Sequence, residues 1–267
     1  MRDHLGEFYD KTSDFQQEQF NTLCRLINTT LPDRSNIKNL IDIGSGTGAR
    51  TAQCFNIFPA LERIAAFEPD HDMIEVARTK YSDPRIRYFP APAAGVSQAK
   101  ELSASFDFIL SNWSVHWVPD KEKMLHDIAA LTRPGAHIAF STCERLPSIL
   151  TMIDAYVRAE FMVPAEKTPY FYLDKNQWVE LMTRHGWEIR DIRAFSVDRE
   201  VDSAEHYLMS WFAASTTKFM HGKHLIEMNR LSLSDLVWMM NRAFPSKRHQ
   251  NGIAFSEDVL FFVARRK

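Results

Sequence analysis

Glycine is scarce in this chain: 9 of the 267 residues are glycine, about half the frequency of roughly 7% that is typical of proteins. Three of the nine nevertheless fall within five residues, at Gly44, Gly46 and Gly48. Cysteine is also rare, and its three isolated copies form no CxxC pattern. This favours small buried cysteines over a disulfide framework, and a reducing, cytoplasmic setting.

The sequence lacks both an excess of charge and a long apolar run. Its 32 basic and 34 acidic residues give a formal net charge of -2, so we expect neither nucleic acid nor an anionic membrane as a partner. No segment approaches the roughly 18 apolar residues of a membrane-spanning helix, and the first residues lack the apolar core of a signal peptide. We therefore expect a soluble, cytoplasmic protein.

Short apolar runs alternate with segments of helical periodicity through the first half of the chain. Strands are predicted at 39–43, 63–67, 86–89, 106–110 and 136–142, with helices after the first, second and fourth of them. Nearly continuous apolar strands are typical of a parallel sheet that is covered on both faces. The pattern predicts an α/β protein with a doubly wound, mostly parallel sheet.

The last third of the chain departs from this alternation. Strands are predicted at 187–197 and 259–264, and the intervening segment of about sixty residues is too long for a structureless loop. Apolar residues recur there at helical spacing, as at Tyr207, Leu208 and Trp211. We predict one domain over 1–267, with an N-terminal helical segment at 1–35 and a helical cap formed by about 144–185 and 199–255.

The clustered glycines occupy a strand–loop–helix unit, Asp42-Ile43-Gly44-Ser45-Gly46-Thr47-Gly48. Such a unit presents backbone N–H groups and a helix N-terminus to a nucleotide-like ligand. The spacing is GxGxG, whereas a dinucleotide fingerprint is GxGxxG and a P-loop ends in GK[ST]. Glu68 follows the second predicted strand, where a carboxylate can accept hydrogen bonds from both ribose hydroxyls of an adenosine group.

Together with the segment SFDFILSNWSVHWVPD, these features resemble the class I S-adenosylmethionine-dependent methyltransferases. The segments YDKTSDFQQEQ, SNWSVHWVPD and SEDVLFFVARRK are most similar to the group of trans-aconitate, malonyl-acyl-carrier-protein and juvenile-hormone-acid methyltransferases. All three activities form methyl esters of carboxylates. The resemblance implies a seven-stranded, Rossmann-like methyltransferase fold with the helical cap inserted before the last strand.

The resemblance also implies the cofactor and its binding residues. The cofactor would be S-adenosyl-L-methionine, released as S-adenosyl-L-homocysteine, with no metal. The usual aspartate after the third strand is replaced by Pro92, so adenine recognition is expected from backbone, with Ala91 and Ala93 as candidates. The implied cofactor-binding residues are Asp42, Gly44, Ser45, Gly46, Gly48, Glu68, Met73, Ala91, Asn112 and Trp113.

A carboxylate acceptor is ionised at neutral pH, so its methylation requires positioning and no general base. The residues expected to bind the acceptor are Tyr9, Gln17, Trp117 and Arg145. Core packing is an equal alternative for Trp117. His116 is the candidate base if the acceptor is a hydroxyl or an amine.

The predicted function is O-methylation of a carboxylate, with a small organic acid or an acyl-carrier-bound acid as the partner. Two alternatives stay open. One is methylation of a hydroxyl, amine or carbon of another metabolite, because one fold serves many substrates. The other is a non-catalytic module that binds S-adenosylmethionine.

Overall fold

A computed structural model of the chain describes residues 5–93, 96, 105–161, 171–214 and 232–267. Its centre is a seven-stranded sheet of order β3-β2-β1-β4-β5-β7-β6. The strands up to β5 pair in parallel, and β7 runs antiparallel to both of its neighbours. The strands are β1 (Asn39–Ile43), β2 (Arg63–Phe67), β3 (Ile86–Phe89), β4 (Phe106–Asn112), β5 (Thr132–Cys143), β6 (Trp187–Val201) and β7 (Ile253–Arg266). The predicted α/β class and mostly parallel sheet are confirmed.

Helices connect the strands, and several begin at the caps that the sequence provides. Asp70 accepts hydrogen bonds from the backbone N–H groups of Asp72 and Met73, and Asp120 accepts one from Lys123. These contacts satisfy N–H groups that the first helical turn leaves without partners. The helices are α1 (Leu5–Thr12), α2 (Asp14–Thr30), α3 (Ala49–Ile57), α4 (His71–Lys80), α5 (Lys121–Leu131), α6 (Ser148–Phe161), α7 (Lys175–Arg184), α8 (Ala204–Ala214) and α10 (Leu233–Ala243), with a 3₁₀ turn at Val115–Trp117. In the part of the chain that the structure describes, none of these helices combines the length and apolarity that crossing a bilayer requires.

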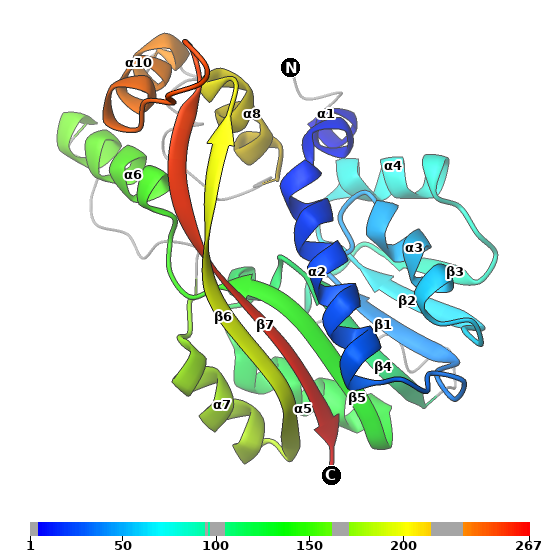
Figure 1. Cartoon of the computed structure of the whole chain (residues 1–267). Coiled ribbons are helices and arrows are strands. Elements are labelled where there is room, and N and C mark those ends of the chain that lie inside the picture. Colours follow the sequence, from blue (N-terminus) through cyan, green and yellow to red (C-terminus); the bar gives the residue numbers. More distant parts are fainter. Residues whose placement is uncertain (1–4, 94–95, 97–104, 162–170, 215–231) are drawn as a thin grey trace.

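The sheet separates two hydrophobic cores. One core joins side chains of α2, α3 and α4 to one face, with Leu23, Cys54 and Ala77 fully buried. The other core joins α5 and α7 to the opposite face, including Leu125 and Trp178. Helices thus cover both faces of the sheet, in three layers (Figure 1). Because strands β1 to β5 are parallel, their carboxyl ends meet at one edge of the sheet, where ligands of doubly wound sheets bind.

A third core lies beyond this edge and belongs to the cap. β7 pairs with β5 only from Val259 onward, and its first residues pair with β6 alone as a two-stranded antiparallel extension, which we call the β6–β7 ribbon. Helices α6, α8 and α10 lie at the end of the β6–β7 ribbon that is away from the C-terminus (Figure 1). They bury Ile149, Leu208 and Met240 against Ile253 and its neighbours. The cap therefore has its own hydrophobic core.

Two cap boundaries differ from the sequence prediction. The segment 144–185 divides between two layers, because α7 buries Trp178, Leu181 and Met182 in the core of the sheet. The Trp178 ring packs 4.6 Å from the ring of Phe140 on β5. The last strand begins at Ile253 instead of 259, because its first residues pair with β6 in the β6–β7 ribbon.

Candidate active site

The glycine loop between β1 and α3 turns at the carboxyl edge of the sheet. Its three glycines have positive φ angles of 72° (Gly44), 56° (Gly46) and 83° (Gly48), a region that L side chains rarely adopt. The N–H groups of Gly44 and Ser45 donate to the carbonyl of Phe67, at 2.8 and 3.0 Å. The loop is therefore fixed to the end of β2, and Gly48 forms the N-cap of α3.

The three glycines differ in what surrounds them. A Cβ atom on Gly44 would lie 2.3 Å from the Ser114 side chain, and one on Gly48 would lie 2.5 Å from the Tyr88 hydroxyl. Among the described residues, a Cβ atom on Gly46 would meet nothing closer than the Tyr9 ring, at 3.7 Å. Gly44 and Gly48 are thus required by packing, whereas Gly46 leaves room for a ligand to approach the backbone.

Ser45 supplies a second sign of a ligand site. Its Oγ atom is buried and has no hydrogen-bond partner among the described residues. Buried hydroxyl groups in proteins nearly always have a partner. A polar ligand group in the loop would satisfy this oxygen.

Glu68 follows β2 and faces the loop. Its Oε2 atom accepts a hydrogen bond from the N–H of Gly46, and Oε1 accepts one from the N–H of Asp70, each at 3.0 Å. Burial raises the pKa of the Glu68 carboxyl to about 7, although these two hydrogen bonds lower it in part. A carboxylate in this position can accept the hydroxyl groups of a ribose.

Asp42 lies beneath the loop and is buried. The hydroxyl of Thr51 on α3 donates to its Oδ2 atom at 2.6 Å. Burial raises the pKa of the Asp42 carboxyl to about 6, and the Thr51 hydrogen bond opposes this shift. The pair joins β1 to α3 directly below the glycines.

Asn112 and Trp113 end β4 next to the loop. The Asn112 amide donates to the Gln16 carbonyl at 2.9 Å and accepts from the Ser141 hydroxyl at 2.8 Å. Trp113 has a φ angle of 58° and is the one residue other than glycine with a positive φ angle in the described chain. Backbone strain of this kind persists only where surrounding contacts impose it, as they often do at active sites.

Helix α1 covers the loop from the side opposite the sheet. The Asp10 carboxylate accepts hydrogen bonds from the Thr47 hydroxyl at 2.8 Å and from the Tyr81 hydroxyl at 3.1 Å. Tyr9 lies next to Gly46, and burial raises the pKa of its hydroxyl. Tyr9, which we expected at the acceptor, therefore lies against the predicted cofactor loop.

The remaining predicted cofactor residues lie at the ends of neighbouring elements. Met73 is buried in the first turn of α4. Ala91 is buried just after β3, whereas Pro92 is exposed. Their contacts with adenine stay predictions.

Three residues predicted to bind the acceptor lie at different places. The Gln17 amide donates to Gln53 on α3 at 3.0 Å. Trp117 packs against the hydrophobic core of the cap. Arg145 forms an ion pair with Asp258, and its side chain is 78% exposed. The structure therefore does not bring these three residues together at one position, and their contacts with an acceptor stay predictions.

His116 is buried behind Trp113. Its Nδ1 atom lies 3.2 Å from the Thr142 hydroxyl. Burial, and to a smaller extent the charge of Lys121, lowers the pKa of the imidazole to about 3. It is therefore neutral and a weak base at pH 7, which disfavours the general-base role considered from the sequence.

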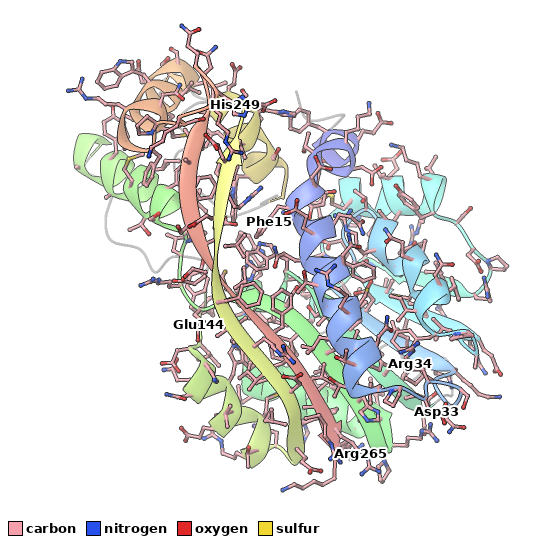
Figure 2. All side chains as sticks on the ribbon, viewed as in Figure 1. Phe15, Asp33, Arg34, Glu144, His249 and Arg265 are labelled. Carbon is pink, nitrogen blue, oxygen red and sulfur yellow. The ribbon has the colours of Figure 1, made fainter. Side chains whose placement is uncertain are left out.

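A cavity of about 400 Å³ lies between α2, the end of β6 and α8. We call it the α2–α8 cavity. Its lining includes Phe15, Gln16, Arg199, Tyr207 and Trp211. Figure 2 shows Phe15 on α2 facing the β6–β7 ribbon, and His249, another lining residue, near the end of that ribbon that is away from the C-terminus.

No local pattern in the sequence selects Arg199 as a site residue, because its ionic partner is Glu257, 58 positions along the chain. Asp10 was likewise missed as the residue that fixes α1. Asp10 lies within YDKTSDFQQEQ, next to Tyr9. The resemblance of this segment to methyltransferases points to its importance but does not identify Thr47 as the partner of Asp10.

Known proteins share this sequence pattern and architecture. Residues 15–192 match the family described as "Methyltransferase domain". The malonyl-[acyl-carrier protein] O-methyltransferase of Halalkalibacterium halodurans is 23% identical over 177 residues, which are 65% of each chain. The trans-aconitate 2-methyltransferase of Deinococcus radiodurans is 29% identical over 116 residues, which are 43% of this chain and 42% of that protein.

A solved structure confirms the fold over nearly the whole chain. Phosphoethanolamine N-methyltransferase 2 of Haemonchus contortus, in complex with phosphomonomethylethanolamine and S-adenosylhomocysteine, matches with a TM-score of 0.54 at 16% identity. The match covers 92% of this chain and 52% of that one. The two curated relatives are matched over at most 65% of their own length. Because the family match spans most of the sheet and its glycine loop, the chain belongs to the methyltransferase domain family.

Proposed function

We propose that this protein is an S-adenosylmethionine-dependent methyltransferase that esterifies a carboxylate. The observation that carries the proposal is the glycine loop, where Gly46 leaves space, Ser45 has an unsatisfied hydroxyl and Glu68 presents a carboxylate. These groups fit the amino-acid and ribose parts of S-adenosylmethionine. The family match and the relatives named as O-methyltransferases support the same activity.

Each part of the proposed site has a distinct task. Bound S-adenosylmethionine supplies an activated methyl group on a sulfonium. Gly46 and Ser45 hold its amino-acid part, and Glu68 holds the ribose. Asn112 and Trp113, at the end of β4, line the side from which an acceptor approaches. Tyr9 and α1 cover the site and exclude water, which favours direct transfer.

Carboxylate chemistry agrees with the low pKa of His116, the candidate base considered from the sequence. A carboxylic acid with a pKa of about 4 is already ionised at neutral pH. The low pKa of His116 makes its imidazole unsuitable for removing a proton from a hydroxyl or an amine. The residues near β4 then need only to orient the carboxylate oxygen towards the methyl carbon.

The relatives suggest two kinds of acceptor. One is named for a malonyl group on acyl-carrier protein and the other for trans-aconitate. We propose that the acceptor is a small organic acid or an acid carried on such a protein.

Two measurements test the proposal. Calorimetry should detect binding of S-adenosylmethionine, and the Glu68→Ala variant should bind it more weakly. Incubation with labelled cofactor and a panel containing trans-aconitate and a malonyl thioester should yield a methylated product that mild base hydrolyses, as it does esters. Lack of cofactor binding would refute the proposal. A base-stable product would refute carboxylate esterification and favour an ether, amine or carbon acceptor.

A further inference from the structure

The α2–α8 cavity contains an arginine that the proposed transfer of a methyl group does not by itself require. Arg199 on β6 and Glu257 on β7 lie on the same face of the β6–β7 ribbon, diagonally across the ladder, since Arg199 pairs with Phe255 and Val197 with Glu257. The Nη1 atom of Arg199 lies 3.3 Å from Oε2 of Glu257. The two side chains are 16% and 0% exposed.

Three aromatic rings lie around the guanidinium of Arg199. Its central carbon lies 4.0 Å from the ring centre of Phe15, 5.7 Å from that of Tyr207 and 5.6 Å from that of Phe255. The Tyr207 hydroxyl donates to Oε1 of Glu257 at 3.2 Å. The aromatic contacts and Glu257 thus hold Arg199 in one orientation.

Among the residues that the structure describes, Glu257 is the one hydrogen-bond partner of the guanidinium, which leaves donors for a ligand. It carries five N–H groups, and the contact with Glu257 engages its Nη1 end. Because the N–H bonds of a guanidinium lie in its plane, further hydrogen-bond acceptors must approach its edge. Arg199 is part of the cavity lining, and a planar guanidinium edge matches the two oxygens of a carboxylate.

Acidic residues in the same lining leave Arg199 available. Glu200 is engaged elsewhere, because its Oε1 atom accepts from the Ser246 hydroxyl and from the backbone N–H of Lys247. Asp14 and Asp202 are exposed to solvent, which screens their charge. The described lining contains one arginine and one lysine. Arg199 is partly buried, whereas Lys11 is exposed.

The cavity adjoins the end of β4 through two contacts. Phe15 touches Arg199 on one side and packs edge-to-face against Trp113, with ring centres 4.9 Å apart. Gln16 lines the cavity, and its carbonyl accepts the hydrogen bond from Asn112. The Phe15 ring therefore lies between an acid group bound by Arg199 and Trp113, one of the residues where we place methyl transfer.

We propose that Arg199 binds a second acid group of the acceptor, so that the preferred acceptor is a small molecule with two acid groups, of which the one remote from Arg199 is methylated. The identity of the methylated group rests on the proposed function, whereas the binding of an acid group by Arg199 does not. A cavity of about 400 Å³ lies within the range that holds small ligands, roughly 300 to 1,000 Å³.

Variants must separate ligand binding from the structural role of the ion pair. Removal of Arg199 alone would leave the buried Glu257 charge without its partner and would destabilise the fold. The double variant Arg199→Met/Glu257→Gln removes both charges and keeps an oxygen for the Tyr207 hydroxyl. Arg199→Lys keeps the charge but loses the planar edge. Arg190→Met, on the same strand and paired with Glu188 at 3.0 Å, is the matched control.

The experiment uses the straight-chain dicarboxylates from malonate to suberate, each with the monocarboxylate of equal length. For the best pair, the wild type and Arg190→Met should show kcat/KM for the dicarboxylate about 10- to 100-fold above that for the monocarboxylate, as expected for a hydrogen-bonded charged group. In Arg199→Met/Glu257→Gln this ratio should fall to about 1 through a higher KM, and Arg199→Lys should lie between. Calorimetric affinity for S-adenosylhomocysteine should be equal in all four proteins.

A second readout does not depend on methylation. Binding of the same dicarboxylates is measured by calorimetry with S-adenosylhomocysteine present. Binding that disappears in the double variant supports the Arg199 site, even if no methyl ester forms and the proposed function fails. Ester formation with an unchanged ratio, or unchanged dicarboxylate binding in the double variant, overturns the Arg199 site and leaves the proposed function intact. Failure of every dicarboxylate to bind the wild type also overturns the site.

Discussion

Substitution of Gly46 by alanine separates ligand binding from folding in the glycine loop. The φ angle of 56° makes an L side chain unfavourable there, by about 1 to 2 kcal/mol. Of the atoms that the structure describes, the new methyl group would meet only the Tyr9 ring, at an ordinary 3.7 Å. We expect Gly46→Ala to lower Tm by about 2 to 8 °C. Because the methyl group enters the space left for a ligand, affinity for S-adenosylhomocysteine should fall about tenfold or more.

Two other glycines supply the comparison. Gly186 has a φ angle of 79°, and a methyl group there would meet no described atom within 4 Å, so Gly186→Ala should lower Tm as much as Gly46→Ala without changing affinity. In Gly44→Ala the methyl group would displace Ser114, whose hydroxyl donates to the Ile43 carbonyl at 2.7 Å. Its total destabilisation should be about 2 to 5 kcal/mol, from the strained backbone and the lost hydrogen bond.

The assays are differential scanning calorimetry and titration calorimetry with S-adenosylhomocysteine, performed on the three variants and the wild type. Gly46→Ala with wild-type affinity would refute the assignment of the open side of the loop to the ligand. Equal Tm losses in Gly44→Ala and Gly46→Ala would refute the packing argument for Gly44.

Three further predictions concern charged and polar groups beside the loop. Burial places the pKa of Glu68 near 7, above its unfolded value of 4.5, so apoprotein stability should decrease as pH rises from about 4.5 to 7; Glu68→Gln should reduce this slope in pH-dependent melting. Affinity for S-adenosylhomocysteine should rise from pH 6 to 8, because ribose hydroxyls donate to the ionised carboxylate, and a flat profile would contradict this assignment. Thr51→Val removes the hydrogen-bond donor to buried Asp42 and should destabilise the fold by about 1 to 3 kcal/mol, measured by urea unfolding; an unchanged midpoint would exclude a stabilising contact. Asp10→Ala removes the acceptor of the Thr47 hydroxyl and should speed amide exchange in α1 and weaken cofactor binding; unchanged exchange would show that other contacts hold α1.

Local patterns were enough to predict the elements that carry the glycine loop. The strand at 39–43, the left-handed glycines and the helix that follows depend on neighbouring residues, and the structure has β1, the loop and α3 at these positions. The same holds for Asp70 as the cap of α4. Glu68 could be placed beside the loop because consecutive parallel strands end at the same edge of a sheet.

Other features depend on residues that are distant in the sequence. The apolar spacing of α7 predicted a helix, but only the position of Phe140 and Phe262 decided that it packs on the sheet instead of in the cap. A positive φ angle at Trp113 has no signature in the sequence, because contacts from the ends of β1 and β5 impose it.

The sequence by itself determined the order of strands and helices, the glycine loop and the resemblance to methyltransferases, since each is encoded in residues close together along the chain. The tertiary structure alone decided that α1 covers the loop through Asp10, and that Arg199 meets Glu257 beside Phe15. Such contacts form when long segments fold back on one another, and the side chains involved carry no local pattern that identifies their partners.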